Sequence, residues 1–178
     1  MNLPNKLSIL RILCIPVITV LLQCQPDWCR WAALGVFCLA SFTDYLDGNL
    51  ARKHQWITDF GKFIDPVADK LLVLSTMILL ADRGLLPAWI VILILARELS
   101  VDGLRMVAVT KGNVIAAGKA GKLKTVSQMA LICLLLVMHV PAFSHWAPLA
   151  LTVWVICITL YSGVEYFVNN REVFRETA

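Results

Sequence analysis

The sequence predicts an all-α membrane protein, a polytopic bundle of six transmembrane helices with a polar cavity facing the cytoplasm. Of the 178 residues, 59% are hydrophobic and only 16% are charged, whereas a soluble domain is about half apolar and about a quarter charged. The mean hydropathy is +0.75. Six apolar blocks alternate with short charged connections, and the length suits one domain covering residues 1–178.

The apolar blocks give the helices in chain order. They cover residues 12–24, 31–42, 71–81, 85–96, 126–140 and 147–164. Only the last block approaches the roughly 20 residues that a helix needs to cross a bilayer. The second, third and fourth helices must therefore continue into their charged flanks, through residues 44–52, 63–70 and 97–109 respectively.

The charged flanks predict both the cavity and its orientation. Ionisable groups at the membrane boundary are costly unless they face a bundle interior or a wet cavity, so these flanks indicate a shared polar cavity. With six helices, all Lys and Arg residues except Arg30 and Arg83 fall on the face that carries both termini, which is 14 of 16. The positive-inside rule places that face in the cytoplasm. The net charge of +4 includes no polybasic tail, so no nucleic-acid partner is expected.

Four carboxylates follow the second apolar block and precede the third. Asp44 and Asp47 are three residues apart, and Asp65 and Asp69 are four apart, so each pair projects from one face of its helix. Two antiparallel helices then bring four carboxylates to one point, where their mutual repulsion requires cations. Oxygen ligands favour a hard ion, and four carboxylates can hold two divalent cations, Mg²⁺ or Mn²⁺.

The residues beside these carboxylates indicate a diphosphate site. Gly48 and Ala51 keep the helix face open to a ligand, and Arg52 offers a planar fork of donors to phosphate. Asp59 is expected to be a solvated carboxylate in the connecting loop, and Pro66 is expected within the first turns of its helix, where a missing N–H is tolerated.

The stretch from Asp44 to Asp69 resembles the signature of the CDP-alcohol phosphatidyltransferases, DxxDGxxAR followed after eight residues by GxxxDxxxD, at every fixed position. The resemblance implies a six-helix enzyme of the bacterial cytoplasmic membrane, in contact with membrane lipids and homodimeric. It moves a phosphatidyl group from CDP-diacylglycerol to an alcohol and releases CMP.

The resemblance also implies roles for individual residues. The four aspartates become ligands of a two-metal site, and Asp69 also takes the proton from the attacking hydroxyl. The positions that line the cytidine diphosphate pocket correspond to Gly48, Ala51 and Arg52, with Thr58 as a weaker match.

The basic residues further along the chain bear on the acceptor. On the fourth predicted helix, Glu98, Asp102 and Arg105 share one face, with Arg97 adjacent. Residues 118–125 place three lysines and two glycines at the start of the fifth helix, where free N–H groups favour phosphate. Lys111 and Lys119 are expected to contact lipid headgroups.

Arg105 and Lys122 are the expected phosphate ligands, and a phosphorylated acceptor points to glycerol 3-phosphate. The wider chain, about residues 3–130, resembles the bacterial members of the family that use this acceptor. This resemblance implies that Arg105 and Lys122, with Arg97 and Lys124 beside them, hold the acceptor, and that Asn5 and Arg11 close the nucleotide end. The last two helices carry little beyond hydrophobicity.

Two alternatives remain open. The same motif could serve another acceptor, as in a cardiolipin synthase or an inositol-phosphate transferase. A bundle with central carboxylates could also be a divalent-cation transporter. Against the transporter, the sequence has no inverted repeat, and the only acids on the predicted outer face are Asp27 and Asp82.

Overall fold

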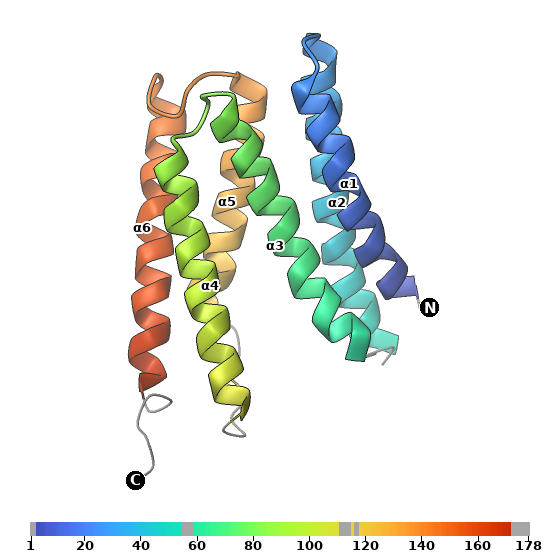
Figure 1. The fold of residues 1–178 in the computed structure, drawn as a ribbon, viewed down its shortest axis with the longest axis vertical. Coiled ribbons are helices and arrows are strands. Elements are labelled where there is room, and N and C mark those ends of the chain that lie inside the picture. Colours follow the sequence, from blue (N-terminus) through green and yellow to red (C-terminus); the bar gives the residue numbers. More distant parts are fainter. Residues whose placement is uncertain (1–2, 55–58, 111–114, 116–117, 172–178) are drawn as a thin grey trace.

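The computed structural model describes residues 3–54, 59–110, 115 and 118–171, with side chains described for residues 7–43, 64–110, 115 and 118–171. The described residues form six helices and no strand, as the sequence predicts (Figure 1). These helices are α1 (Leu3–Gln23), α2 (Asp27–His54), α3 (Asp59–Asp82), α4 (Ala88–Thr110), α5 (Lys119–Met138) and α6 (Trp146–Asn169).

The six helices run up and down, so that the start of α1 and the end of α6 lie at the same end of the bundle (Figure 1). Helix α1 packs against α2 and α3, and α5 packs against α6. The groups are linked by α3, which also contacts α4 and α5, and by a direct contact of α2 with α5. The end of α2, the start of α3 and the end of α4 lie at the same end as the termini, so the charged flanks gather there.

The charged flanks are helical, as the short apolar blocks required. Helix α2 continues to His54, and α4 continues to Thr110. Two local expectations were wrong because α3 begins earlier than its flank suggested. Asp59 is the first residue of α3 and does not lie in a loop, and Pro66 lies seven residues further on, inside the helix and beyond its first turn.

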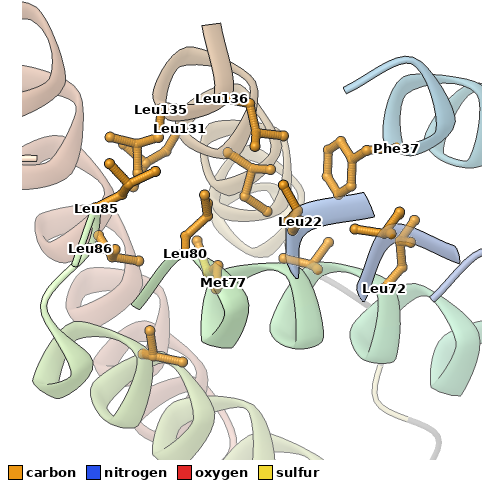
Figure 2. Packing of buried hydrophobic residues seen from close by; sticks show 14 of the residues in the cluster. Leu22, Phe37, Leu72, Met77, Leu80, Leu85, Leu86, Leu131, Leu135 and Leu136 are labelled. Carbon is orange, nitrogen blue, oxygen red and sulfur yellow. The ribbon is translucent and has the colours of Figure 1, made fainter. Parts of the chain in front are cut away.

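The apolar core is built from all six helices and from the turn after α3. Figure 2 shows part of it, with Met77 and Leu80 of α3 lying between Leu22 on one side and Leu86 on the other, and with Leu72 further along α3, beyond Leu22. These side chains are all at most 1% exposed. The core therefore joins the two groups of helices through α3 and through the contact between α2 and α5.

The outer surface of the bundle is also apolar. Large side chains such as Ile92, Met106 and Val164 are more than 60% exposed, and extended apolar surface is typical of proteins that contact lipid or a partner. Helices α5 and α6 are long and apolar enough to cross a membrane, and the apolar part of α1, Leu7–Gln23, is shorter. The structure thus bears out six helices, while six membrane crossings remain a prediction.

Candidate functional site

A polar cavity of about 280 Å³ lies between α3, α4, α5 and α6. Its polar and charged lining residues are Asp69, Lys70, Arg97, Glu98, Asp102, Arg105, Lys122, Lys124, Thr125, Gln128, Ser162, Glu165 and Tyr166. The structure therefore brings one motif aspartate together with all four basic residues predicted for the acceptor.

The two aspartates of α3 receive hydrogen bonds from α1. Asp65 and Asp69 lie one turn apart on α3, and both are partly exposed. The Ser8 hydroxyl donates to Oδ1 of Asp65, and Nη1 of Arg11 donates to Oδ1 of Asp69 at 3.0 Å. Arg11 is 2% exposed, so this guanidinium is buried against the carboxylate. The contact places Arg11 at the motif, beside the aspartate predicted to be the base.

Ser8 was not among the predicted site residues. Its signal in the sequence is the spacing of three between Ser8 and Arg11, which puts both on one face of α1. That face meets α3 at Asp65 and Asp69, which are four residues apart and also share one helix face. The contact between two helices was needed to reveal this pairing.

The remaining motif residues are placed only through their backbones. Asp44 and Asp47, with Gly48, Ala51 and Arg52, lie on the last turns of α2, and α2 contacts α3. Their side chains lie outside the described set, as does the side chain of Asn5 on α1. Thr58 lies outside the described residues altogether. The roles expected of these residues stay predictions.

The described carboxylates suit a divalent cation. Asp65 and Asp69 present oxygen donors on successive turns, which are the ligands that Mg²⁺ and Mn²⁺ prefer. The cationic Arg11 against Asp69 indicates that positive charge is stabilised at this point. Among the residues with described side chains, which do not include Asp44 and Asp47, three or more potential ligands do not cluster. A complete site would require the two aspartates of α2.

A group of ion pairs surrounds the buried Glu98, which is 6% exposed. Lys124 binds its Oε1 atom, Nη1 of Arg97 lies 3.3 Å from the same atom, and Nζ of Lys70 lies 3.8 Å from Oε2. Lys70 also binds Asp102. Because a buried charge needs partners, Glu98 holds Arg97 and Lys124 at the cavity wall and offsets their charge.

Arg105 and Lys122 are not held in this group. Nε of Arg105 donates to the Tyr166 hydroxyl at 2.8 Å, and Lys122 is exposed. Within the described part of the chain, neither side chain forms an ion pair. These two cations are therefore the ones whose charge is least offset, and they suit an anionic ligand.

Two buried nitrogen atoms of cavity residues add to this picture. Nε of Arg97 and Nε2 of Gln128 have no hydrogen-bond partner among the described atoms, and Gln128 is only 2% exposed. Buried donors without partners are costly, so an oxygen-rich ligand would satisfy them. Gln128 was not predicted, because a single glutamine in an apolar helix has no distinctive sequence pattern.

Helix α6 supplies a cavity wall that the sequence did not predict. Ser162, Glu165 and Tyr166 line the polar cavity, which makes the expectation of mere hydrophobicity for the last two helices wrong. Their spacing of three and four residues marks one helix face. This short polar face at the end of an apolar helix was the available signal.

Comparison with known proteins agrees with the motif. The model of the CDP-alcohol phosphatidyltransferase family matches residues 1–154. A Bacillus subtilis protein named CDP-diacylglycerol--glycerol-3-phosphate 3-phosphatidyltransferase is 41% identical, covering 98% of this chain and 97% of its own. An Escherichia coli K12 protein of the same name is 34% identical, covering 96% and 95%. A Mycobacterium tuberculosis H37Rv protein named probable phosphatidylglycerophosphate synthase is 39% identical, covering 99% and 87%.

The match extends over most of the chain and includes the complete acidic motif from Asp44 to Asp69. The relatives align over almost their entire lengths, so the likeness is not confined to a shared segment. The chain belongs to the CDP-alcohol phosphatidyltransferase family.

Proposed function

We propose that this chain is an integral membrane enzyme that moves the phosphatidyl group of CDP-diacylglycerol to glycerol 3-phosphate, giving phosphatidylglycerophosphate and CMP. The observation that carries the proposal is the polar cavity, where Asp69 of the family motif shares a lining with Arg105 and Lys122. The relatives from B. subtilis and E. coli, whose names specify this reaction, support it.

Asp69 is the proposed general base. Its carboxylate takes the proton from the C1 hydroxyl of glycerol 3-phosphate, and the hydroxyl oxygen attacks the phosphorus that bears diacylglycerol. The bond between this phosphorus and the phosphate oxygen of CMP breaks, and CMP leaves. Arg105 and Lys122 bind the acceptor phosphate, with Arg97 and Lys124 beside them at the cavity wall.

Divalent cations are general in this family. In this chain, Asp44, Asp47, Asp65 and Asp69 would hold two, either Mg²⁺ or Mn²⁺. When bound, such ions neutralise a diphosphate and ease the departure of its leaving group.

CDP-diacylglycerol is proposed to bind beside the first turns of α1 and the last turns of α2. Gly48, Ala51, Arg52 and Thr58, closed by Asn5 and Arg11, would contact cytidine diphosphate. A second cavity of about 220 Å³ between α1 and α2 reaches Arg11 and is lined mainly by apolar side chains, including Leu10 and Leu39. This cavity supports a lateral approach of CDP-diacylglycerol with its acyl chains on the apolar side.

The proposed location is the bacterial cytoplasmic membrane, with six crossings, both termini and the polar cavity in the cytoplasm. The whole chain, residues 1–178, would form one domain, and two copies would form a homodimer. The excess of Lys and Arg at the end of the bundle that carries the termini supports this orientation.

The test is an acceptor comparison on the purified protein in detergent micelles. CMP release from CDP-diacylglycerol is measured with Mg²⁺ and either glycerol 3-phosphate, phosphatidylglycerol, inositol phosphate or serine. We expect release only with glycerol 3-phosphate, and loss of release when a chelator removes the cation. Release with phosphatidylglycerol or inositol phosphate instead would assign a different acceptor. No release with any acceptor, together with Mg²⁺ flux in vesicles, would favour a transporter.

The acceptor site has its own test. Arg105→Ala should raise the KM for glycerol 3-phosphate far more than the KM for CDP-diacylglycerol, because the phosphate loses its cation. The matched control is Arg83→Ala, since Arg83 lies after α3 and donates to the Cys24 carbonyl at 3.1 Å, away from the polar cavity. Unchanged acceptor kinetics in Arg105→Ala would remove Arg105 from the site.

A further inference from the structure

We propose that Tyr166 of α6 is a positioning residue that orients Arg105 for the phosphate of the acceptor. This inference rests on the proposed function and deepens it. It gives the last helix a specific part in acceptor recognition, through a side chain that lines the polar cavity together with Arg105.

Tyr166 contacts the guanidinium of Arg105 in two ways. Its hydroxyl accepts a hydrogen bond from Nε at 2.8 Å, and the guanidinium carbon lies 5.3 Å from the centre of its ring. The hydrogen bond fixes one edge of the guanidinium, and the ring contact restrains its plane. A flexible side chain on α4 is thereby held by a residue 61 positions further along the chain.

Tyr166 is itself well anchored. It is 7% exposed and packs in a small core cluster with Val101, Leu104 and Ala108 of α4. These three residues lie on the helix that carries Arg105, on either side of it in the sequence. The ring is thus fixed against the backbone that places the arginine, so its hydroxyl is a rigid acceptor.

Tyr166 binds Nε of Arg105, and neither Nη group of this side chain forms a hydrogen bond with a described residue. A guanidinium has five N–H groups, one on Nε and four on the two Nη atoms. Tyr166 is the sole hydrogen-bond partner of this side chain among the described residues. The four Nη hydrogens can therefore meet phosphate oxygens in pairs, which is the geometry in which arginine binds phosphate best.

The contrast with Arg97 supports this division of roles. Nη1 of Arg97 binds Glu98 at 3.3 Å, so the terminal end of this guanidinium is already engaged with a carboxylate. Among the residues with described side chains, Arg105 contacts Tyr166 and no carboxylate, so no described residue offsets its positive charge through an ion pair. Because Tyr166 fixes the orientation of Arg105, the N–H groups of the guanidinium point in a defined direction.

The decisive variant is Tyr166→Phe, which keeps the buried ring and removes the hydroxyl. We expect the KM for glycerol 3-phosphate to rise about threefold to tenfold, the range that corresponds to one net hydrogen bond. The kcat, the KM for CDP-diacylglycerol and the melting temperature in detergent should stay close to those of the unchanged protein. Tyr161→Phe is the matched control, because Tyr161 lies on the same helix and is 61% exposed.

A double-mutant cycle separates positioning from a general structural effect. If Tyr166 acts through Arg105, Tyr166→Phe should have no further effect on the acceptor KM in the Arg105→Ala background. Additive effects, an unchanged acceptor KM in Tyr166→Phe, or an equal loss for both substrates would overturn the proposal. The activity of the wild-type protein with glycerol 3-phosphate is measured first. If the wild type has no such activity, both the proposed function and this inference are contradicted. If the wild type is active and Tyr166→Phe has the same acceptor KM, only the inference is contradicted.

Discussion

Asp69 is the residue at which the two parts of the proposed site meet, because it binds Arg11 of α1 and also lines the polar cavity. An asparagine at this position keeps the shape of the side chain but cannot take a proton. Asp69→Asn should therefore lower kcat by at least about 100-fold, the usual scale of general-base catalysis. The measurement is CMP release with glycerol 3-phosphate, with the melting temperature recorded to verify folding.

Asp82→Asn is a suitable control for this prediction, because Asp82 is the last residue of α3, at the opposite end of the helix from the motif. It should leave kcat unchanged. Near-normal turnover in Asp69→Asn would exclude Asp69 as the base. The carboxylates of α2 would then be the candidates for that role.

Glu98 is the residue on which the charges of the cavity wall depend, since it pairs with the buried Lys124 and with Arg97. Glu98→Gln should destabilise the protein by about 3 to 5 kcal/mol, the usual cost of leaving a buried charge without its partner. Thermal unfolding in detergent measures this loss. The double variant Glu98→Gln, Lys124→Met should recover much of it, and equal melting temperatures for all three proteins would contradict the role given to this ion pair.

At the scale of whole helices, the lengths of the apolar blocks were enough to predict that α2 and α4 continue through charged sequence. The first residues of the helices were harder to predict, because hydrophobic periodicity does not mark the first turn of a helix. Helix α1 begins at Leu3, well before its apolar block, and Pro4 is tolerated there because the first N–H groups of a helix have no helical partner. The early start of α3 likewise moved Asp59 into a helix.

The candidate site was predictable only where its residues share one helix. The common face of Glu98, Asp102 and Arg105 follows from spacing alone, and all three line the polar cavity. The pairing of Arg105 with Tyr166 joins residues 61 positions apart and depends on how α4 packs against α6. A single sequence contains no signal for such a pairing, so this part of the site had to come from the structure.

The packing of α6 against α4 leaves little room at Gly163. A methyl group there would meet Cγ of Arg97 at 3.3 Å, whereas one at Gly35 of α2 would have no atom within 4 Å. Alanine favours helices over glycine by up to about 1 kcal/mol, so Gly35→Ala should raise the melting temperature. Gly163→Ala should gain less stability than Gly35→Ala, by about 1 kcal/mol, the lower end of the usual cost of overpacking, because Arg97 must give way by a few tenths of an ångström.

Thermal unfolding of the two glycine variants, side by side in the same detergent, measures this difference. Because Arg97 must shift to accept the methyl group, the acceptor KM of Gly163→Ala should also rise, while that of Gly35→Ala should not. Equal stabilisation by both substitutions would show that α6 can move away from α4 without cost.

At the scale of the whole molecule, the basic residues are distributed unequally between the two ends of the bundle. The first residues of α1 and the last residues of α6 lie at one end (Figure 1), and on the predicted topology that end carries 14 of the 16 Lys and Arg residues. Basic residues are retained on the cytoplasmic side during insertion. The polar cavity would then open toward the side from which a water-soluble, phosphorylated acceptor arrives.

Reporter fusions in bacterial cells test this orientation. A reporter that is fluorescent only in the cytoplasm should be active when it is fused after Ala178. An enzyme reporter that folds only outside the cytoplasmic membrane should be active when it is fused after Gly84 or after Ser144. Both of these positions lie in turns at the opposite end of the bundle. Changing Arg30 and Arg83 to glutamine should leave this pattern intact, because the charge difference between the two sides only grows. An exported enzyme reporter that is active after Ala178 would invert the topology, and the polar cavity would then face away from its proposed substrate.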